Sequence, residues 1–269
     1  MNPAPTALVT GASRGIGRAT AIALAEAGFD VAITARTVNE GDDTARTASG
    51  ALLPGSLAST AAEITARGRR AVSIPLDLLD AGALVPAVQA AIAGLGQLDV
   101  VVNNAIYVAP GGPKAFLDLD PDDLVKQLWG DLTAQLLLLQ AQVAHMVSRG
   151  RGVIINIGSG SGKYRLPMPI AEGGPQLPYC AAKAGFHRAA DRIAFEYGGS
   201  GVVAFTVDPG FVATERTRMV SELGGIAARG VEPLVVGRAI VWLATHGVAE
   251  KENGSYHQAQ DLARELGLL

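Results

Sequence analysis

The chain has 269 residues, a formal net charge of −3 and a hydrophobic fraction of 49%. This length and apolar content suit one large α/β domain with a substantial core. The mixed charges form no basic stretch and aromatic residues are few, which excludes the usual features of a nucleic-acid-binding surface.

Composition also indicates where the protein works. No uninterrupted apolar stretch reaches about 18 residues, and no basic region followed by an apolar core opens the chain. The single cysteine, Cys180, excludes an intrachain disulfide and suits a reducing compartment; it is either a small buried filler or an oxidation-sensitive thiol. The four histidines have no ligand spacing, so no metal site is expected. We expect a soluble, cytoplasmic protein with no membrane partner.

Short runs rich in Val, Ile and Leu alternate with helical patterns along the chain. The runs predict strands at residues 7–10, 31–35, 71–75, 100–103, 152–157 and 202–207, with a short seventh strand near 255–258. The helical patterns lie at 15–27, 57–67, 81–93, 124–148, 179–197 and 234–245. Nearly continuous apolar strands are typical of a parallel sheet covered on both faces. The alternation predicts a single α/β domain over residues 1–269, with a doubly wound Rossmann-type sheet.

A glycine-rich turn, Gly11-Ala-Ser-Arg-Gly15-Ile-Gly17, joins the first predicted strand to the first helix. In this context such glycines indicate a dinucleotide site. Gly11 permits a tight turn, Gly15 lets the backbone approach a pyrophosphate, and Gly17 lets the helix pack close to the strand. The helix N-terminus supplies free N–H groups for phosphate. The expected cofactor contacts in the turn are Gly11, Ser13, Arg14, Gly15, Ile16 and Gly17.

The end of the second strand indicates which cofactor is used. An NAD site has an acidic residue here that bonds the ribose hydroxyls, whereas this chain has Ala35 followed by Arg36. A guanidinium at this place can pair with a 2′-phosphate, and Arg14 can add a second cation. The alternative is that both arginines are solvated surface charges. The sequence favours NADP as cofactor, with NAD as the second choice.

Two segments interrupt the alternation of strands and helices. Glycine, proline, asparagine and aspartate gather at residues 37–56, and prolines and glycines at 162–178. Long loops in compact domains are either functional or merely mobile. The second segment lies between Ser159 and Tyr179, so we expect it to form part of a substrate pocket. The first is either functional or a surface insertion.

Tyr179 and Lys183 lie four residues apart on one predicted helix. This spacing puts the phenol and the ammonium on one helical face. A cation held there favours phenolate over phenol and lowers the pKa of the tyrosine. A tyrosine of this kind can exchange a proton with an alcohol or a carbonyl near neutral pH. The pair predicts acid–base chemistry.

These motifs together resemble those of the short-chain dehydrogenase/reductase family. Thr10-Gly-x-x-x-Gly-x-Gly17, Asn103-Asn104-Ala105, Ser159, Tyr179 with Lys183, and Pro209-Gly210 follow one another in the family's order. The resemblance implies that Ser159, rather than Ser161, holds the substrate oxygen, and that Lys183 also bonds the nicotinamide ribose. It further implies cofactor contacts at Asp77, Leu78, Asn104, Ala105, Tyr179, Lys183, Pro209, Gly210, Val212 and Thr214.

The chain departs from the family's pattern at two positions. Ile106 replaces a glycine that usually follows Asn-Asn-Ala, which narrows the site. Asp131 stands where the family commonly has an asparagine that completes a proton relay with the lysine through water. Asp131 either preserves this relay through its main-chain carbonyl, as a fourth catalytic residue, or is an exposed helix residue. The family also implies a homodimer or homotetramer.

The sequence therefore predicts an NADP(H)-dependent oxidoreductase that interconverts a secondary alcohol and a ketone by hydride transfer, with Tyr179 as acid or base. Two alternatives remain. One is an epimerase or dehydratase on the same scaffold. The other is a regulator that senses NADPH without turnover, which would not need a tyrosine with a shifted pKa such as Tyr179.

Overall fold

Seven parallel strands form one sheet in the order β3-β2-β1-β4-β5-β6-β7. The computed structural model describes residues 3–47, 49–109, 111–170, 174–220, 224–246 and 252–269. The strands are β1 (Thr6–Thr10), β2 (Asp30–Ala35), β3 (Ala71–Pro75), β4 (Val100–Asn103), β5 (Gly152–Ile157), β6 (Val202–Asp208) and β7 (Tyr256–Gln258). The strand order reverses between β1 and β4, and ligands of such sheets bind outside the carboxyl ends of the strands at this point.

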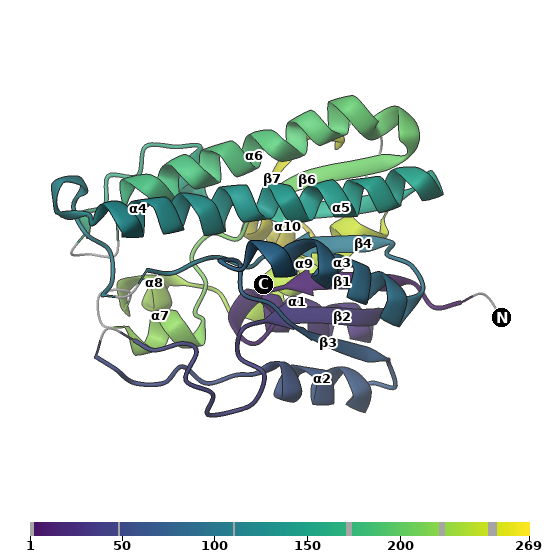
Figure 1. Ribbon diagram of the computed structural model, residues 1–269, viewed down its shortest axis with the longest axis horizontal. Coiled ribbons are helices and arrows are strands. Elements are labelled where there is room, and N and C mark those ends of the chain that lie inside the picture. Colours follow the sequence, from purple (N-terminus) through teal and green to yellow (C-terminus); the bar gives the residue numbers. More distant parts are fainter. Residues whose placement is uncertain (1–2, 48, 110, 171–173, 221–223, 247–251) are drawn as a thin grey trace.

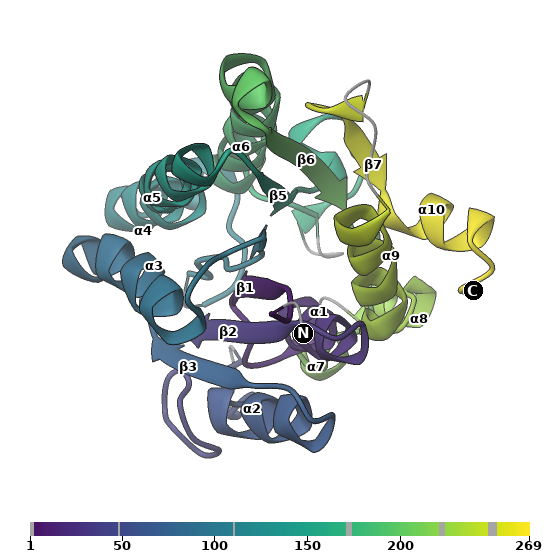
Figure 2. The same cartoon turned by 90° about the vertical axis from the view of Figure 1, so that its right-hand side faces the viewer.

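Helices cover both faces of the sheet (Figures 1 and 2). They are α1 (Gly15–Glu26), α2 (Leu57–Ala66), α3 (Ala81–Leu95), α4 (Pro121–Leu128), α5 (Ala134–Arg149), α6 (Leu177–Tyr197), α7 (Glu215–Met219), α8 (Gly224–Arg229), α9 (Pro233–Thr245) and α10 (Ala259–Glu265). One buried cluster joins the sheet to α1, α2, α9 and α10, and a second joins it to α3, α5 and α6. Among the described residues, no helix is both long and apolar enough to cross a membrane.

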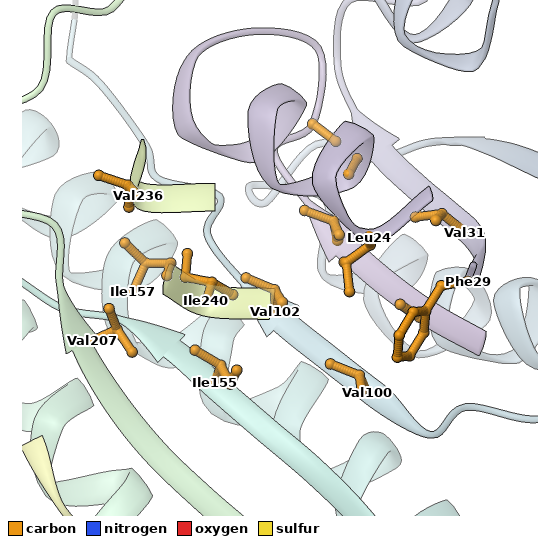
Figure 3. Packing of buried hydrophobic residues seen from close by; sticks show 14 of the residues in the cluster. Leu24, Phe29, Val31, Val100, Val102, Ile155, Ile157, Val207, Val236 and Ile240 are labelled. Carbon is orange, nitrogen blue, oxygen red and sulfur yellow. The ribbon is translucent and has the colours of Figure 1, made fainter. Parts of the chain in front are cut away.

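Adjacent residues of each central strand enter opposite clusters, because successive side chains of a strand point to opposite faces. On β4, Val100 and Val102 belong to the first cluster and Val101 to the second. Figure 3 shows Val102 with Leu24 of α1 and Ile240 of α9 around it. This two-sided burial explains the nearly continuous apolar character of the strands.

The predicted doubly wound α/β fold and all seven strands are confirmed. The predicted helical pattern over residues 124–148 is present, but it is not α-helical throughout. A π-helical turn at Trp129–Thr133 separates α4 from α5. The π-helical turn adds one residue to the α-helical spacing. One added residue shifts the hydrophobic pattern too little to be detected from a period of 3.6 residues. Such π-bulges frequently occur at functional sites.

Candidate active site

A cavity of about 220 Å³ opens between the carboxyl ends of β1, β2 and β4. Most of the predicted cofactor residues lie on its walls: Gly11, Ser13, Arg14, Gly15, Ile16, Arg36, Asp77, Leu78, Asn104, Ala105 and Thr214. Gly17, Tyr179, Lys183, Pro209, Gly210 and Val212 do not line this cavity. Ile106, which replaces the family's glycine, lines it and is 42% exposed.

The glycine turn needs glycine for two different reasons. Gly11 has a φ of +67°, a conformation that other residues rarely adopt. Gly17 has no such strain, but a Cβ there would lie 2.3 Å from the carbonyl oxygen of Gly11 and 2.5 Å from Nδ2 of Asn104. Asn104 Nδ2 donates to the carbonyl of Thr10 at 2.9 Å, which ties the turn to the end of β4. The expected close packing at Gly17 is thus present.

The N-terminus of α1 already binds a carboxylate. The backbone N–H of Gly15 donates to Oε2 of Glu215 at 2.9 Å. An anion is favourable here because the first N–H groups of a helix lack partners and carry partial positive charge. Glu215 shows that this end of α1 takes an oxyanion of the kind a phosphate presents.

Arg14 fastens the 37–56 segment to the glycine turn. Its guanidinium donates to the carbonyls of Pro54 and Gly55, each at 2.8 Å, and to Oγ1 of Thr37 at 3.0 Å. Thr37 and Ala45 from this segment line the cavity. The segment is therefore a wall of the pocket, so its interpretation as a mere surface insertion is wrong. Arg14 is likewise not a solvated surface charge.

The predicted catalytic side chains gather beside the ends of β5 and α6. Lys183 is buried, and its Nζ donates to the carbonyl of Ile157 at 2.8 Å. The same Nζ lies 5.7 Å from the centroid of the Tyr179 ring. Oγ of Ser159 lies 2.8 Å from Oγ of Ser161, so the two candidate serines share one hydrogen bond.

The predicted lowering of the pKa of Tyr179 is wrong, because the net shift is upward. Burial raises the pKa of the phenol above its ordinary value of 10.0, and the charges of Asp131 and Asp208 raise it further. A hydrogen bond with Ser159 opposes this shift without cancelling it. At neutral pH the side chain is therefore a neutral phenol, the form that donates a proton.

Asp131 is buried within the π-helical turn and close enough to Lys183 to feel its charge, so its interpretation as an exposed helix residue is wrong. Oδ1 accepts from the backbone N–H of Tyr107 at 2.6 Å, and Oδ2 accepts from Nε2 of Gln127. Burial raises the pKa of this carboxyl to about 6, although the positive charge of Lys183 opposes the change. Burial in turn lowers the pKa of Lys183, which Asp131 and Asp208 counteract.

Sequence reasoning did not identify two residues of the site, His187 and Asp208. The backbone N–H of Ser159 donates to Nε2 of His187 at 3.1 Å, so this histidine fixes the position of the serine. Asp208 is buried and accepts from the hydroxyl of Tyr256 at 2.8 Å. The neighbouring Pro209-Gly210 motif was the available signal for Asp208, whereas nothing in the sequence indicated His187.

Two further expectations concern metals and the cysteine. The part of the chain that the structure describes contains no group of three side chains that could hold a metal ion. Cys180 is partly exposed rather than fully buried, and burial raises the pKa of its thiol. A raised pKa reduces the thiolate fraction and therefore its susceptibility to oxidation.

Comparisons with known proteins agree with this geometry. The family model described as short chain dehydrogenase matches residues 5–223. The chain is 32% identical to a 3-oxoacyl-(acyl-carrier-protein) reductase from Synechocystis sp. over 91% of both chains. It is 34% identical to an L-rhamnose 1-dehydrogenase (NAD(P)(+)) from Sphingomonas sp., over 78% of this chain and 73% of that protein. A 3-oxoacyl-(acyl-carrier protein) reductase from Brucella melitensis, crystallised with NAD, superposes with a TM-score of 0.76 at 26% identity, covering 98% of this chain and 99% of that one.

Proposed function

The chain belongs to the short-chain dehydrogenase family, and we propose that it is an NADP(H)-dependent enzyme that interconverts a secondary alcohol and a ketone. The observation that carries the proposal is the convergence of Ser159, Tyr179 and Lys183 at the carboxyl ends of the strands. A hydroxyl, a phenol and an ammonium held together there can orient a carbonyl, protonate its oxygen and stabilise the resulting charge.

The residues around the cavity fit a nicotinamide dinucleotide. The N-terminus of α1 hydrogen-bonds the carboxylate of Glu215, which supports a phosphate site at this place. Gly17 leaves no room for a side chain between the turn and the helix. Arg14 and Arg36 line the cavity where a 2′-phosphate would bind, and Ala35 supplies no carboxylate to repel it. These features support NADP over NAD as the preferred cofactor.

When bound, the nicotinamide supplies or accepts the hydride. Ser159 holds the substrate oxygen, and Tyr179 donates its phenolic proton to that oxygen during reduction. The raised pKa of Tyr179 keeps the proton in place until the carbonyl oxygen gains negative charge. Lys183 stabilises the phenolate that remains, and Asp131 keeps the neighbouring ammonium charged. In oxidation the same groups act in reverse.

The remaining predicted contacts belong to the nicotinamide side of this proposal. Pro209, Gly210, Val212 and Thr214 follow β6 directly, and Gly210 has a φ of +67°. The backbone N–H of Gly210 donates to Oδ1 of Asp208 at 3.0 Å, which holds the turn in shape. We assign this turn to the carboxamide end of the cofactor.

A panel of ketones assayed with NADPH and with NADH tests the proposal. We expect NADPH oxidation with at least one ketone, a slower rate with NADH, and loss of the reaction in Tyr179→Phe. Equal or faster rates with NADH would contradict the cofactor assignment. NADPH binding without turnover of any ketone would instead identify a nucleotide-sensing regulator. Isomerisation of a substrate without net NADPH oxidation would identify an epimerase.

We also propose that the protein is cytoplasmic and self-associates, as a homodimer or homotetramer, through α5 and α6. Leu136 of α5 and Phe195 of α6 support this, since they are 40% and 79% exposed on the chain alone. Burying such apolar side chains between two copies is favourable. Light scattering on the purified protein would measure the assembly, and Phe195→Glu should weaken it.

A further inference from the structure

Three arginines from distant parts of the chain line the cofactor cavity. Arg14 comes from the glycine turn, Arg36 from the end of β2, and Arg216 from α7. Arg216 is half-buried. Burial lowers the pKa of its guanidinium, and the positive charges of Arg14 and Arg36 lower it further. The three guanidinium groups therefore lie close enough to repel one another.

Carboxylates compensate part of this charge at Arg14, where Glu215 and Glu40 act to raise the pKa of the guanidinium. The ion pairs among the described residues involve neither Arg36 nor Arg216. Glu215, the acidic neighbour of Arg216 in the chain, is hydrogen-bonded to the N–H of Gly15. Arg36 is exposed and Arg216 is half-buried, and like charges held this close together favour an anion bound between them.

Arg14 is already engaged, which leaves two guanidinium groups for such an anion. Its Nε and one terminal nitrogen donate to the carbonyls of Pro54 and Gly55. Arg36 and Arg216 have no hydrogen-bond partner among the described residues that would have to be broken first. A guanidinium presents two parallel N–H donors that match a phosphate.

The location distinguishes between the phosphates of a dinucleotide. The diphosphate belongs at the N-terminus of α1, where Gly15 binds the carboxylate of Glu215. The 2′-phosphate belongs beside Arg36, at the end of β2. Arg216 lines the same cavity as Arg36 and Arg14, near enough for their charges to lower the pKa of its guanidinium. We propose that Arg216, together with Arg36, binds the 2′-phosphate of NADP(H), so that α7 helps to select the cofactor.

This inference rests on the proposed function, and equilibrium binding tests it without any turnover. Arg216→Gln and Arg36→Gln would each be titrated with NADPH, NADH and 2′,5′-ADP, following tryptophan fluorescence. Arg218→Gln is the matched control, because Arg218 lies on the same helix but is exposed and paired with Glu232.

We expect Arg216→Gln to weaken NADPH and 2′,5′-ADP binding by about tenfold or more, and NADH binding by less than about twofold. The affinity of Arg216→Lys for NADPH should lie between those of the wild type and Arg216→Gln, because an ammonium keeps the charge but loses the paired donors. Arg218→Gln should bind all three ligands like the wild type. The unliganded Arg216→Gln protein should melt no lower than the wild type, because the substitution removes a repulsion.

Two results would overturn the inference: NADPH binding that is unchanged in Arg216→Gln, or an equal loss for NADPH and NADH. If Arg36→Gln alone showed the selective loss, the inference would fail while the proposed function stood. If the wild-type protein itself bound NADH as tightly as NADPH, both would fail.

Discussion

Replacing Asp131 by asparagine should change the stability of the protein in a pH-dependent way that favours the variant as the pH rises. Burial raises the pKa of this carboxyl from 3.8 to about 6, and each pKa unit corresponds to about 1.4 kcal/mol. Between these two values the folded state binds more protons than the unfolded state, so the free energy of unfolding falls as the pH rises. Above about pH 6 the ionised carboxylate destabilises the fold by about 3 kcal/mol.

Asparagine is uncharged, like the protonated acid, and its Oδ1 can still accept from the N–H of Tyr107, whereas its Nδ2 cannot accept from Nε2 of Gln127. The lost hydrogen bond lowers stability equally at every pH, so urea unfolding should show the stability of Asp131→Asn relative to the wild type rising by up to about 3 kcal/mol from pH 4 to pH 8. Asp118→Asn, at an exposed aspartate nearby, is the control and should show no such change with pH. A stability difference that is the same at both pH values would refute the reasoning, and so would a difference that shifts in favour of the wild type as the pH rises.

Three other substitutions test separate parts of the site. Tyr179→Phe should lower kcat by about 10²–10⁴-fold, as expected for lost acid–base catalysis. Isothermal titration should show NADPH binding within about twofold of that of the wild type, and an unchanged kcat would exclude the phenol from the mechanism. Gly17→Ala should abolish NADPH binding and lower the urea midpoint, since the new Cβ would lie 2.3 Å from the carbonyl oxygen of Gly11. Gly199→Ala, where a Cβ meets nothing within 4 Å, is its control; wild-type binding in Gly17→Ala would contradict the packing argument. Glu215→Gln should tighten NADPH binding by about three- to tenfold, because the cofactor no longer displaces a charge-assisted hydrogen bond from the N-terminus of α1. Unchanged or weaker binding would show that Glu215 does not compete with the cofactor for this site.

The strands were predictable from the sequence because the sheet buries both faces. Each strand then reads as a run of Val, Ile and Leu, whatever packs against it. The glycine turn was predictable for a similar reason: φ at Gly11 and the close approach at Gly17 each require glycine locally. These features depend on a few neighbouring residues, which the sequence shows directly.

The features that sequence reasoning missed depend on distant contacts. The pKa of Tyr179 rises because folding buries the phenol and brings Asp131 and Asp208 near it, whereas the sequence showed only the helical neighbour Lys183. The carbonyl partners of Arg14 lie about 40 residues away, so its structural role was hidden.

The central claim is that a hydride passes between NADPH and a carbonyl carbon while Tyr179 supplies the proton. NADPH carrying deuterium at the transferable C4 position, incubated with a ketone found to be active in the panel, tests it most directly. Mass spectrometry should find one deuterium on the carbinol carbon of the alcohol formed by the wild type, and almost no alcohol from Tyr179→Phe in the same time. An unlabelled alcohol, or equal yields from the two proteins, would contradict the account.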